Sequence, residues 1–294
     1  MPLREKRIHL KGNQMKNVML TKEKFSNWDN PGKAFITGAT SGIGLSFAKQ
    51  LAQQGFNLVL LARRKDRLKT IASELEFQNS IRCEIIQADL SEIGDIEKTV
   101  DYIRQLNDLD VLVNNAGFAT LGYFADVPIE KSLGMLNVHL TATIQFTHAA
   151  IKGMLKRKRG AIINVSSMGS FVLTPGNVVY DATKSFLNTF SENLKLEMQD
   201  MDIRIQALCP GATRTEFHEV GDLKNYDRKA IPDSMWMSPD KVVTLSLKAL
   251  GKNKKIIFIP GWKKRLSKWI IMHSSVARKA LVDKANKDIS KENK

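Results

Sequence analysis

The sequence predicts an α/β fold in which a parallel sheet carries helices on both of its faces. From residue 33 onward, short apolar runs alternate with longer segments of helical period, which is the pattern of βαβ units. In addition, the glycine-rich turn TGATSGIG joins the first apolar run to the first helical segment. Together these observations favour a Rossmann-like, doubly wound sheet of seven strands.

The seven expected strands are short, rich in β-branched residues and apolar on both faces, as strands buried in a parallel sheet must be. They cover residues 33–37, 56–62, 82–88, 110–116, 160–166, 203–209 and 255–259. The expected helices include residues 42–55, 66–78, 95–107, 132–158 and 178–199. Because strand and helix alternate strictly, we expect a single domain over residues 33–260.

Positive charge is concentrated at the two ends of the 294-residue chain, whose net charge is +15. Residues 1–33 hold eight Lys or Arg against three acids, and residues 252–294 hold thirteen against three. We therefore expect a basic N-terminal extension over 1–32 and a basic, amphipathic C-terminal extension over 261–294. The body between them is neutral, so no nucleic-acid partner is expected. Solvated tails and attraction to an anionic membrane or an acidic protein both stay open.

Cysteine and histidine usage limits the chemistry. Cys83 and Cys209 both fall in expected strands, which favours buried thiols in a reducing compartment over a disulfide. The sequence has no basic-then-apolar leader and no apolar run of about 18 residues, and we expect a cytoplasmic protein. The five histidines are scattered without ligand spacing, so no metal site is expected. His139 and His148 are interpreted as packing or surface groups.

The glycine-rich turn lies between the first strand and a helix start, where backbone N–H groups can approach a pyrophosphate. Its glycines have the spacing G-x-x-x-G-x-G instead of the commoner G-x-G-x-x-G. Many glycine-rich turns are only tight turns, but the position of this one favours a nucleotide site. The candidate cofactor-binding residues in it are Gly38, Thr40, Ser41, Gly42, Ile43 and Gly44.

Arg63 and Arg64 directly follow the second strand, and no acid occupies its end. An acid there would hold the adenosine ribose of NAD(H), whereas arginine pairs with the 2′-phosphate of NADP(H). One charge-assisted bond favours the phosphate by about ten- to a hundredfold, so NADP(H) is the expected cofactor. Solvated surface arginines are the alternative. After the third strand, Asp89, followed by Leu90, is either a partner for the adenine amine or the N-cap of the next helix.

Six motifs stand in order along the chain: TGATSGIG, NNAG (114–117), NV (137–138), the serine pair at 166–167, YDATK (180–184) and PGATRT (210–215). With them, residues 33–260 resemble a single-domain short-chain dehydrogenase/reductase. The tail beyond residue 260 is similar to that of DltE-like and 17β-hydroxysteroid/3-ketoacyl reductase-like members. This resemblance implies a lipid-like or β-ketoacyl substrate.

The resemblance also implies roles for four residues. Tyr180 would be the general acid that protonates the substrate carbonyl oxygen. Lys184, one helical turn further on, would lower the pKa of Tyr180 together with the oxidised nicotinamide, and would hold the nicotinamide ribose. The family's spacing selects Ser167, and not Ser166, as the hydroxyl that binds the substrate oxygen. Asn137 would anchor a water relay to Lys184, although an exposed asparagine in a helix is the alternative.

Further cofactor contacts are implied where the fourth and sixth strands end, at Asn115, Ala116, Gly117, Pro210, Gly211, Thr213 and Thr215. Residues 212–237 would form the segment that closes over substrate. Its apolar side chains either suit an apolar substrate or pack against the body; they are Phe217, Tyr226, Met235, Trp236 and Met237.

In the C-terminal extension, apolar residues recur at near-helical spacing: Trp262, Leu266, Trp269, Ile270, Ala277 and Leu281. Tryptophans beside basic residues are typical of a helix in a membrane interface, and packing on the body or across a dimer is the alternative. We expect an NADPH-dependent reductase of a small-molecule ketone or aldehyde that works as a homo-oligomer. An oxidative alcohol or hydroxysteroid dehydrogenase and a non-catalytic nucleotide-binding scaffold are the alternatives.

Overall fold

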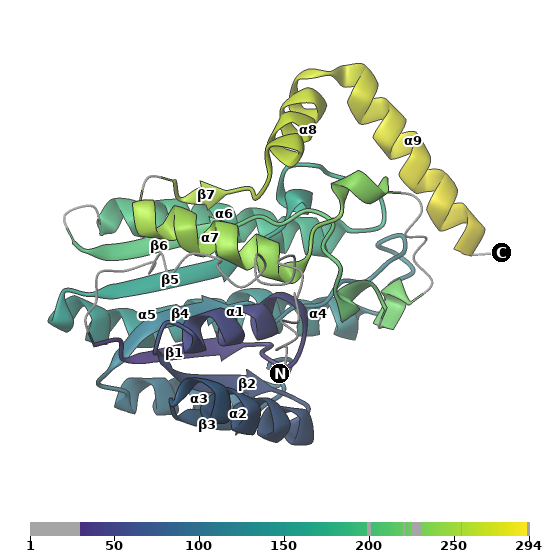
Figure 1. Cartoon of the computed structure of the whole chain (residues 1–294). Helices are drawn as coiled ribbons and strands as arrows, with labels where there is room; N and C mark the ends of the chain where they lie inside the picture. Colours follow the sequence, from purple (N-terminus) through teal and green to yellow (C-terminus); the bar gives the residue numbers. More distant parts are fainter. Residues whose placement is uncertain (1–29, 199–200, 220, 225–230, 254, 293–294) are drawn as a thin grey trace, which may run out of the picture.

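The computed structural model describes residues 30–198, 201–219, 221–224, 231–253 and 255–292. Its centre is a seven-stranded parallel sheet with the strand order β3-β2-β1-β4-β5-β6-β7 (Figure 1). The strands are β1 (Lys33–Thr37), β2 (Asn57–Ala62), β3 (Cys83–Gln87), β4 (Leu109–Asn114), β5 (Gly160–Val165), β6 (Ile203–Leu208) and β7 (Ile257–Phe258). The predicted fold class and all seven predicted strands are confirmed. Predictions for residues 1–29 lie outside the described residues.

Helices cover both faces of the sheet because its strands bury side chains in both directions. In β1, Ala34 and Ile36 face one apolar core and Phe35 faces the other, as the alternation along a strand requires. The first core is covered by α1 (Gly42–Ala52), α2 (Lys65–Asn79) and α7 (Pro239–Lys252). The second is covered chiefly by α3 (Ile93–Gln105) and α5 (Ala142–Arg157).

The long helix expected over residues 132–158 is interrupted. Helix α4 spans Ile129–Leu136, a π-helical turn spans Asn137–Thr141, and α5 follows directly. In this turn the Nδ2 of Asn137 donates a hydrogen bond of 2.8 Å to the carbonyl oxygen of Ser91. Asn137 is therefore not the exposed asparagine of the alternative, since its side chain ties the helix to the loop after β3. Such turns often occur at functional sites.

The two cysteines are free, but only Cys209 is buried. Cys83 is half-buried because β3 is the edge strand of the sheet. The expectation of two buried thiols is therefore wrong for Cys83. Cys209 lies one residue beyond β6, where its thiol donates to the Oδ1 of Asn188 at 3.2 Å.

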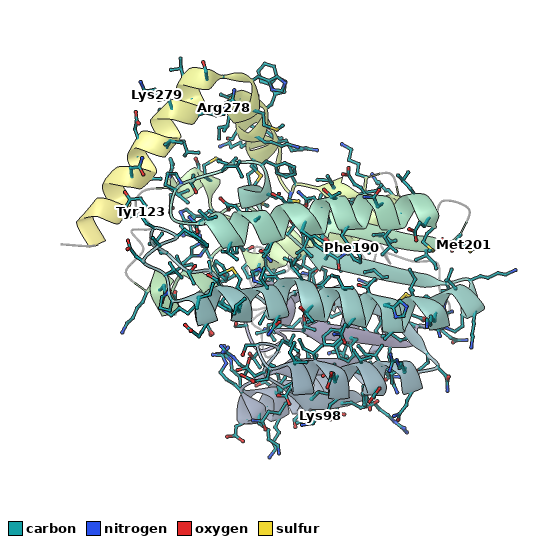
Figure 2. All side chains as sticks on the ribbon, turned by 180° about the vertical axis from the view of Figure 1, so that it is seen from behind. Lys98, Tyr123, Phe190, Met201, Arg278 and Lys279 are labelled. Carbon is teal, nitrogen blue, oxygen red and sulfur yellow. The ribbon has the colours of Figure 1, made fainter. Side chains whose placement is uncertain are left out.

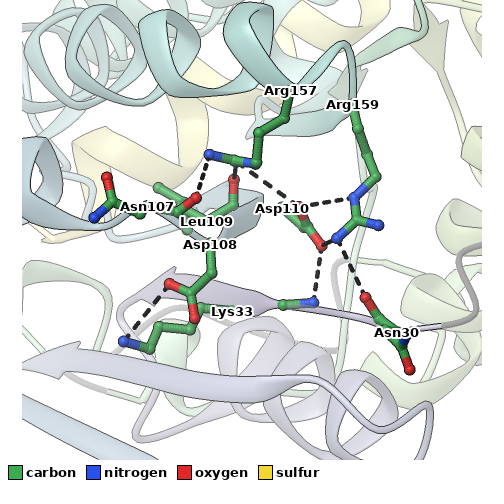
Figure 3. A network of polar contacts seen from close by, with 9 residues as sticks. Asn30, Lys33, Asn107, Asp108, Leu109, Asp110, Arg157 and Arg159 are labelled. Atoms are coloured by element: carbon green, nitrogen blue, oxygen red, sulfur yellow. Dashed lines mark hydrogen bonds and ion pairs between the residues drawn. The ribbon is translucent and has the colours of Figure 1, made fainter.

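A polar network closes the amino end of the sheet (Figure 3). Asp110 in β4 is fully buried, and Arg159 donates to both of its carboxylate oxygens, at 3.1 and 2.6 Å. The backbone N–H of Gly32 donates to the same carboxylate at 2.8 Å. Arg157 donates to the carbonyl oxygens of Asn107 and Leu109. The network fixes the start of β1 and β4 against the turn before β5, at the end of the sheet opposite the glycine-rich turn.

The C-terminal extension forms two helices, α8 (Trp262–His273) and α9 (Ser275–Glu292), which project from the body (Figure 1). The helical spacing expected there is confirmed, with a break at Ser274. Figure 2 shows Arg278 and Lys279 on α9, away from the sheet. Within the part of the chain that the structure describes, no helix has the length and apolar content needed to cross a membrane.

Candidate active site

Three side chains from the YDATK and serine motifs meet where β5 ends against α6 (Val178–Glu197). Ser167 lies beside the phenol of Tyr180, close enough to influence its pKa, and the Ser167 Oγ accepts from the Gly169 N–H at 3.0 Å. Ser166 is turned away, since its buried hydroxyl donates to the carbonyl oxygen of Lys184 at 2.8 Å. The geometry thus brings Ser167 to Tyr180 and gives Ser166 a structural task.

Burial dominates the electrostatics of this group. It raises the pKa of Tyr180 to about 12, against the opposing influence of the Ser167 hydrogen bond. Burial also lowers the pKa of Lys184 to about 8. The Lys184 Nζ donates to the carbonyl oxygen of Val165 at 2.9 Å and lies 5.6 Å from the Tyr180 ring centroid. In the chain without its cofactor, burial disfavours the phenolate, and the lowering of the Tyr180 pKa by Lys184 together with the oxidised nicotinamide stays a prediction.

His139 is a buried member of the site that sequence analysis took for a packing or surface group. Its Nε2 accepts from the Phe118 N–H at 3.2 Å, which assigns the ring proton to Nδ1, 2.8 Å from the Thr183 Oγ1. Its ring stands edge-on to Tyr180, with the centroids 5.8 Å apart. Burial and the nearby Lys184 charge hold the pKa of His139 well below its ordinary value, so the ring is neutral.

The glycine-rich turn is a cradle that only glycine can form. Gly38 and Gly42 have φ angles of +66° and +54°, a region that other residues rarely adopt. A Cβ on Gly44 would lie 2.3 Å from the Gly38 carbonyl oxygen. Ser41, the N-cap of α1, makes no side-chain cap, so N–H groups at the start of α1 are available to an anion. These features fit the pyrophosphate of a dinucleotide.

The NNAG motif fastens β4 to β1 beside this cradle. The Thr37 Oγ1 accepts from the N–H groups of Asn115 and Ala116, each at 2.9 Å. The Asn115 Nδ2 donates to the Thr37 carbonyl oxygen at 2.8 Å. Asn114 is buried and donates to Asn164 at 2.9 Å. The motif therefore has a structural task, and it sets Gly117 near Lys184, because a Cβ on Gly117 would lie 3.6 Å from the Lys184 Nζ.

The two arginines after β2 point in different directions. Arg64 donates to the Thr40 Oγ1 in the glycine-rich turn at 3.0 Å, and it pairs with Glu216 at 3.1 Å. Arg63 is more exposed and lies 3.7 Å from Asp89. Arg67 pairs with the same Glu216 at 2.6 Å. Sequence analysis missed Arg67, although its place one helical turn after Arg64 was a usable signal.

Asp89 is not the N-cap of the next helix, so that alternative is wrong. Helix α3 begins at Ile93 with Glu92 as its N-cap. The Asp89 Oδ1 instead accepts from the N–H and the hydroxyl of Ser91, at 3.0 and 2.7 Å. This is a local Asx turn. Leu90 is buried in the second core, which leaves its backbone as the part able to face a cofactor.

The PGATRT loop connects the cradle to the catalytic group. The Pro210 carbonyl oxygen accepts from the Met168 N–H at 2.9 Å, and the Thr213 Oγ1 donates to the Gly211 carbonyl oxygen at 2.8 Å. A Cβ on Gly42 would lie 2.9 Å from the Thr215 Cγ2. The loop therefore reaches from the serine motif to the glycine-rich turn.

Among the apolar residues expected to close over substrate, Phe217 faces the site, with its ring centroid 6.1 Å from that of Tyr180. Trp236 is buried, and Met237 packs against the first core. Packing is therefore the confirmed alternative for these two residues. Tyr226 lies outside the described residues.

Comparison with known proteins agrees with this geometry. A family model described as short chain dehydrogenase matches residues 33–223. The chain belongs to the short-chain dehydrogenase family. A nicotinamide dinucleotide is the cofactor typical of this family, and membership implies a small-molecule substrate.

Three known proteins illustrate how similar this short-chain dehydrogenase is to others in sequence and in fold. It is 34% identical over 191 residues to a very-long-chain 3-oxoacyl-CoA reductase of Anas platyrhynchos, covering 64% of this chain and 61% of that relative's length. A short-chain dehydrogenase from Sphingobium yanoikuyae solved in complex with NADPH is 31% identical, with a TM-score of 0.73 over 89% of this chain and 95% of that one. A bulky-bulky ketone specific alcohol dehydrogenase from Comamonas testosteroni is 28% identical, with a TM-score of 0.69 over 90% and 95%.

Gly44→Ala is expected to weaken dinucleotide binding and to destabilise the fold, because its Cβ would press on the Gly38 carbonyl oxygen. Crowding of this kind costs about 1–3 kcal/mol of stability, so Tm should drop, and dinucleotide affinity should fall about tenfold because the turn that would hold the pyrophosphate is displaced. Gly94→Ala is the matched control, since a Cβ there meets nothing within 4 Å. Fluorescence titration and thermal unfolding measure both effects, and indistinguishable variants would contradict the cradle.

Proposed function

We propose that the protein is an NADPH-dependent reductase that converts a ketone or aldehyde into an alcohol. The observation that carries this proposal is that Tyr180 has Ser167 and Lys184 beside it, with the Lys184 Nζ held on the Val165 carbonyl oxygen and 5.6 Å from the Tyr180 ring centroid. When bound, the cofactor supplies the hydride that reduces the carbonyl carbon. The protein supplies the proton and the groups that orient the carbonyl oxygen.

Tyr180 is the general acid that delivers its phenolic proton to the substrate oxygen, and Ser167 donates a hydrogen bond to the same oxygen. The raised pKa of Tyr180 keeps this proton in place at neutral pH, which suits reduction better than oxidation, where a phenolate base is needed. Lys184 carries the charge that balances the phenolate left behind. Asn137 holds the water that returns a proton towards Lys184.

Each part of the cofactor can be assigned to a group of residues around the glycine-rich turn. We assign the pyrophosphate to the turn from Gly38 to Gly44 and the 2′-phosphate to Arg63 and Arg64. Tyr180 and Lys184 hold the nicotinamide ribose. Contacts to the remaining parts of the cofactor are assigned to Asp89, Leu90, Asn115, Ala116, Gly117, Pro210, Gly211, Thr213 and Thr215. The absence of an acid at the end of β2 and the NADPH complex of the similar Sphingobium protein support NADP(H).

The substrate is proposed to be apolar and bulky, of the lipid-like or β-ketoacyl kind. Phe217 offers an aromatic face directly beside Tyr180. The printed names of two similar proteins refer to a 3-oxoacyl-CoA and to bulky-bulky ketones. A ketone flanked by long or bulky groups is therefore the first substrate class to test.

The C-terminal helices are proposed to bring this enzyme to an anionic membrane. Helix α8 is anchored to the body by Lys264, which is buried and donates to the Ala212 carbonyl oxygen at 3.1 Å. Its outer side exposes four apolar side chains among basic ones; these are Trp262, Leu266, Trp269 and Ile270. An apolar stripe with basic neighbours suits a lipid headgroup region. A homo-oligomer built through the same helices is the competing proposal.

Tyr180→Phe is expected to lower turnover by about a hundredfold to ten-thousandfold, the usual size of general-acid catalysis. NADPH should still bind to the variant, because the aromatic ring stays in place and Lys184 and the glycine-rich turn are unchanged. Tyr102→Phe, in α3 and hydrogen-bonded to Glu84, is the control and should keep full activity. NADPH consumption with a panel of ketones measures turnover, and near-normal rates for Tyr180→Phe would remove the assigned acid.

The pH profile of kcat/KM for reduction is expected to be level near neutral pH and to fall above an apparent pKa of about 8. As the pH rises through this value, Lys184 loses the charge that balances the phenolate, whereas Tyr180 keeps its proton to about 12. Lys184→Met should be slower throughout and lack the fall near pH 8. An unchanged fall in that variant would show that another group sets it.

Replacing Trp262 and Trp269 together by Ala is expected to weaken binding to vesicles containing phosphatidylserine about tenfold or more, because both exposed rings are lost from the lipid contact. Phe77→Ala is the control, since Phe77 is exposed on α2 in the body. Vesicle sedimentation measures binding, and gel filtration measures size. Unchanged vesicle binding with a smaller oligomer would assign α8 to subunit assembly instead.

A further inference from the structure

One carboxylate holds two of the guanidinium groups that lie beside the glycine cradle. The Glu216 Oε2 accepts from both Nη atoms of Arg64 at 3.1 Å, and its Oε1 accepts from the Arg67 Nη2 at 2.6 Å. Arg64 also donates to the Thr40 Oγ1 in the cradle. The hydrogen bond from Arg67, followed by the influence of Arg64, keeps the pKa of Glu216 below its ordinary value against the effect of burial. The bridging group is thus an anion.

This arrangement resembles the recognition of a phosphate. Guanidinium groups bind carboxylate and phosphate oxygens with the same planar fork. Three N–H donors already converge on Glu216 from the start of α2, where Arg64 is the N-cap and Arg67 lies in the first turn. A phosphate bound to the same N–H donors would lie next to the Glu216 carboxylate. Both groups are negatively charged, so they would repel each other strongly at this short separation.

We propose that Glu216 is an internal competitor for the 2′-phosphate of NADP(H), and that phosphate binding releases it from Arg64 and Arg67. This inference rests on the proposed function, because it assumes that Arg64 binds the 2′-phosphate, and it adds Arg67 to the phosphate site. Glu216 is then a specificity-determining residue, since it weakens NADP(H) and leaves NAD(H) unaffected. In the opposite interpretation, Glu216 positions the arginines for the phosphate. Removing its charge would then weaken the binding of the 2′-phosphate instead of tightening it.

The release of Glu216 also affects the surroundings of Tyr180, because Phe217 follows Glu216 directly in the chain. Glu216 begins a short 3-10 turn that ends at His218, and Thr215 caps this turn by accepting from the Phe217 N–H at 3.3 Å. Phe217, the next residue, is the ring that faces Tyr180. A phosphate that detaches Glu216 therefore loosens the turn that places an aromatic ring beside the general acid.

The first test is a calorimetric titration with adenosine 2′-phosphate, adenosine 5′-phosphate, NADPH and NADH. Glu216→Gln keeps the shape of the side chain and removes its charge. It should tighten adenosine 2′-phosphate and NADPH about tenfold and leave adenosine 5′-phosphate and NADH unchanged. Glu219→Gln removes one negative charge from an exposed site in the same segment and is the matched control for general electrostatics.

The outcomes separate the inference from the proposed function. Unchanged or weaker 2′-phosphate binding by Glu216→Gln would overturn the inference, and so would an equal gain in Glu219→Gln. If the unsubstituted protein binds the 2′- and 5′-phosphates equally and NADPH no better than NADH, the proposed cofactor preference itself is wrong.

Hydrogen–deuterium exchange gives a second readout that does not depend on activity. Adenosine 2′-phosphate lacks the nicotinamide, so it cannot cover residues near Tyr180. Even so, it should speed the exchange of residues 215–219 in the unsubstituted protein, while adenosine 5′-phosphate should not. Glu216→Gln should exchange quickly in this segment without any ligand. Equal protection of the segment in all of these states would overturn the release.

Discussion

Two buried hydrogen bonds that fasten α6 to the end of β5 are the constraint on which the site depends. The Ser166 hydroxyl donates to the backbone of Lys184, and the Lys184 ammonium donates back to the backbone of Val165. One residue of the helix is thus held from both its main chain and its side chain. This double attachment fixes the rotation of α6, and with it the direction in which Tyr180 points towards Ser167. Removing either partner of such a buried hydrogen bond leaves a polar group unsatisfied, which destabilises the folded protein.

Much of the fold could be predicted from the sequence because its signals are local. A strand such as 160–165 is apolar on both faces wherever it lies in a parallel sheet, and TGATSGIG needs its glycines whatever surrounds it. The spacing of Tyr180 and Lys184 is likewise a property of one helix. The rest depended on distant parts of the chain. Nothing near residue 216 in the sequence indicates Arg64 or Arg67, and His139 lies in no motif that marks it as a neighbour of Tyr180.

Burial sets the pKa values of the site in ways that the sequence could not indicate. A lysine beside a phenol favours the phenolate in water, but both groups lie in a site that penalises either charge. The penalty moves the two pKa values towards the uncharged forms, upward for Tyr180 and downward for Lys184. The same environment keeps His139 neutral. The degree of burial follows from the packing of α6, the π-helical turn and the serine loop, which no single segment encodes.

The polar network around Asp110 has a consequence for how such a chain can change. It stabilises the amino end of the sheet, whereas the glycine-rich turn and the candidate site residues Ser167, Tyr180 and Lys184 lie at the opposite end. The residues that stabilise the sheet and the residues of the candidate site therefore lie in separate parts of the molecule. Loops such as residues 212–219 can change in sequence, or be exchanged between relatives, while the polar network around Asp110 continues to stabilise the sheet. Substitutions meant to change the specificity of the protein should therefore leave residues 108–110 and 157–159 unchanged.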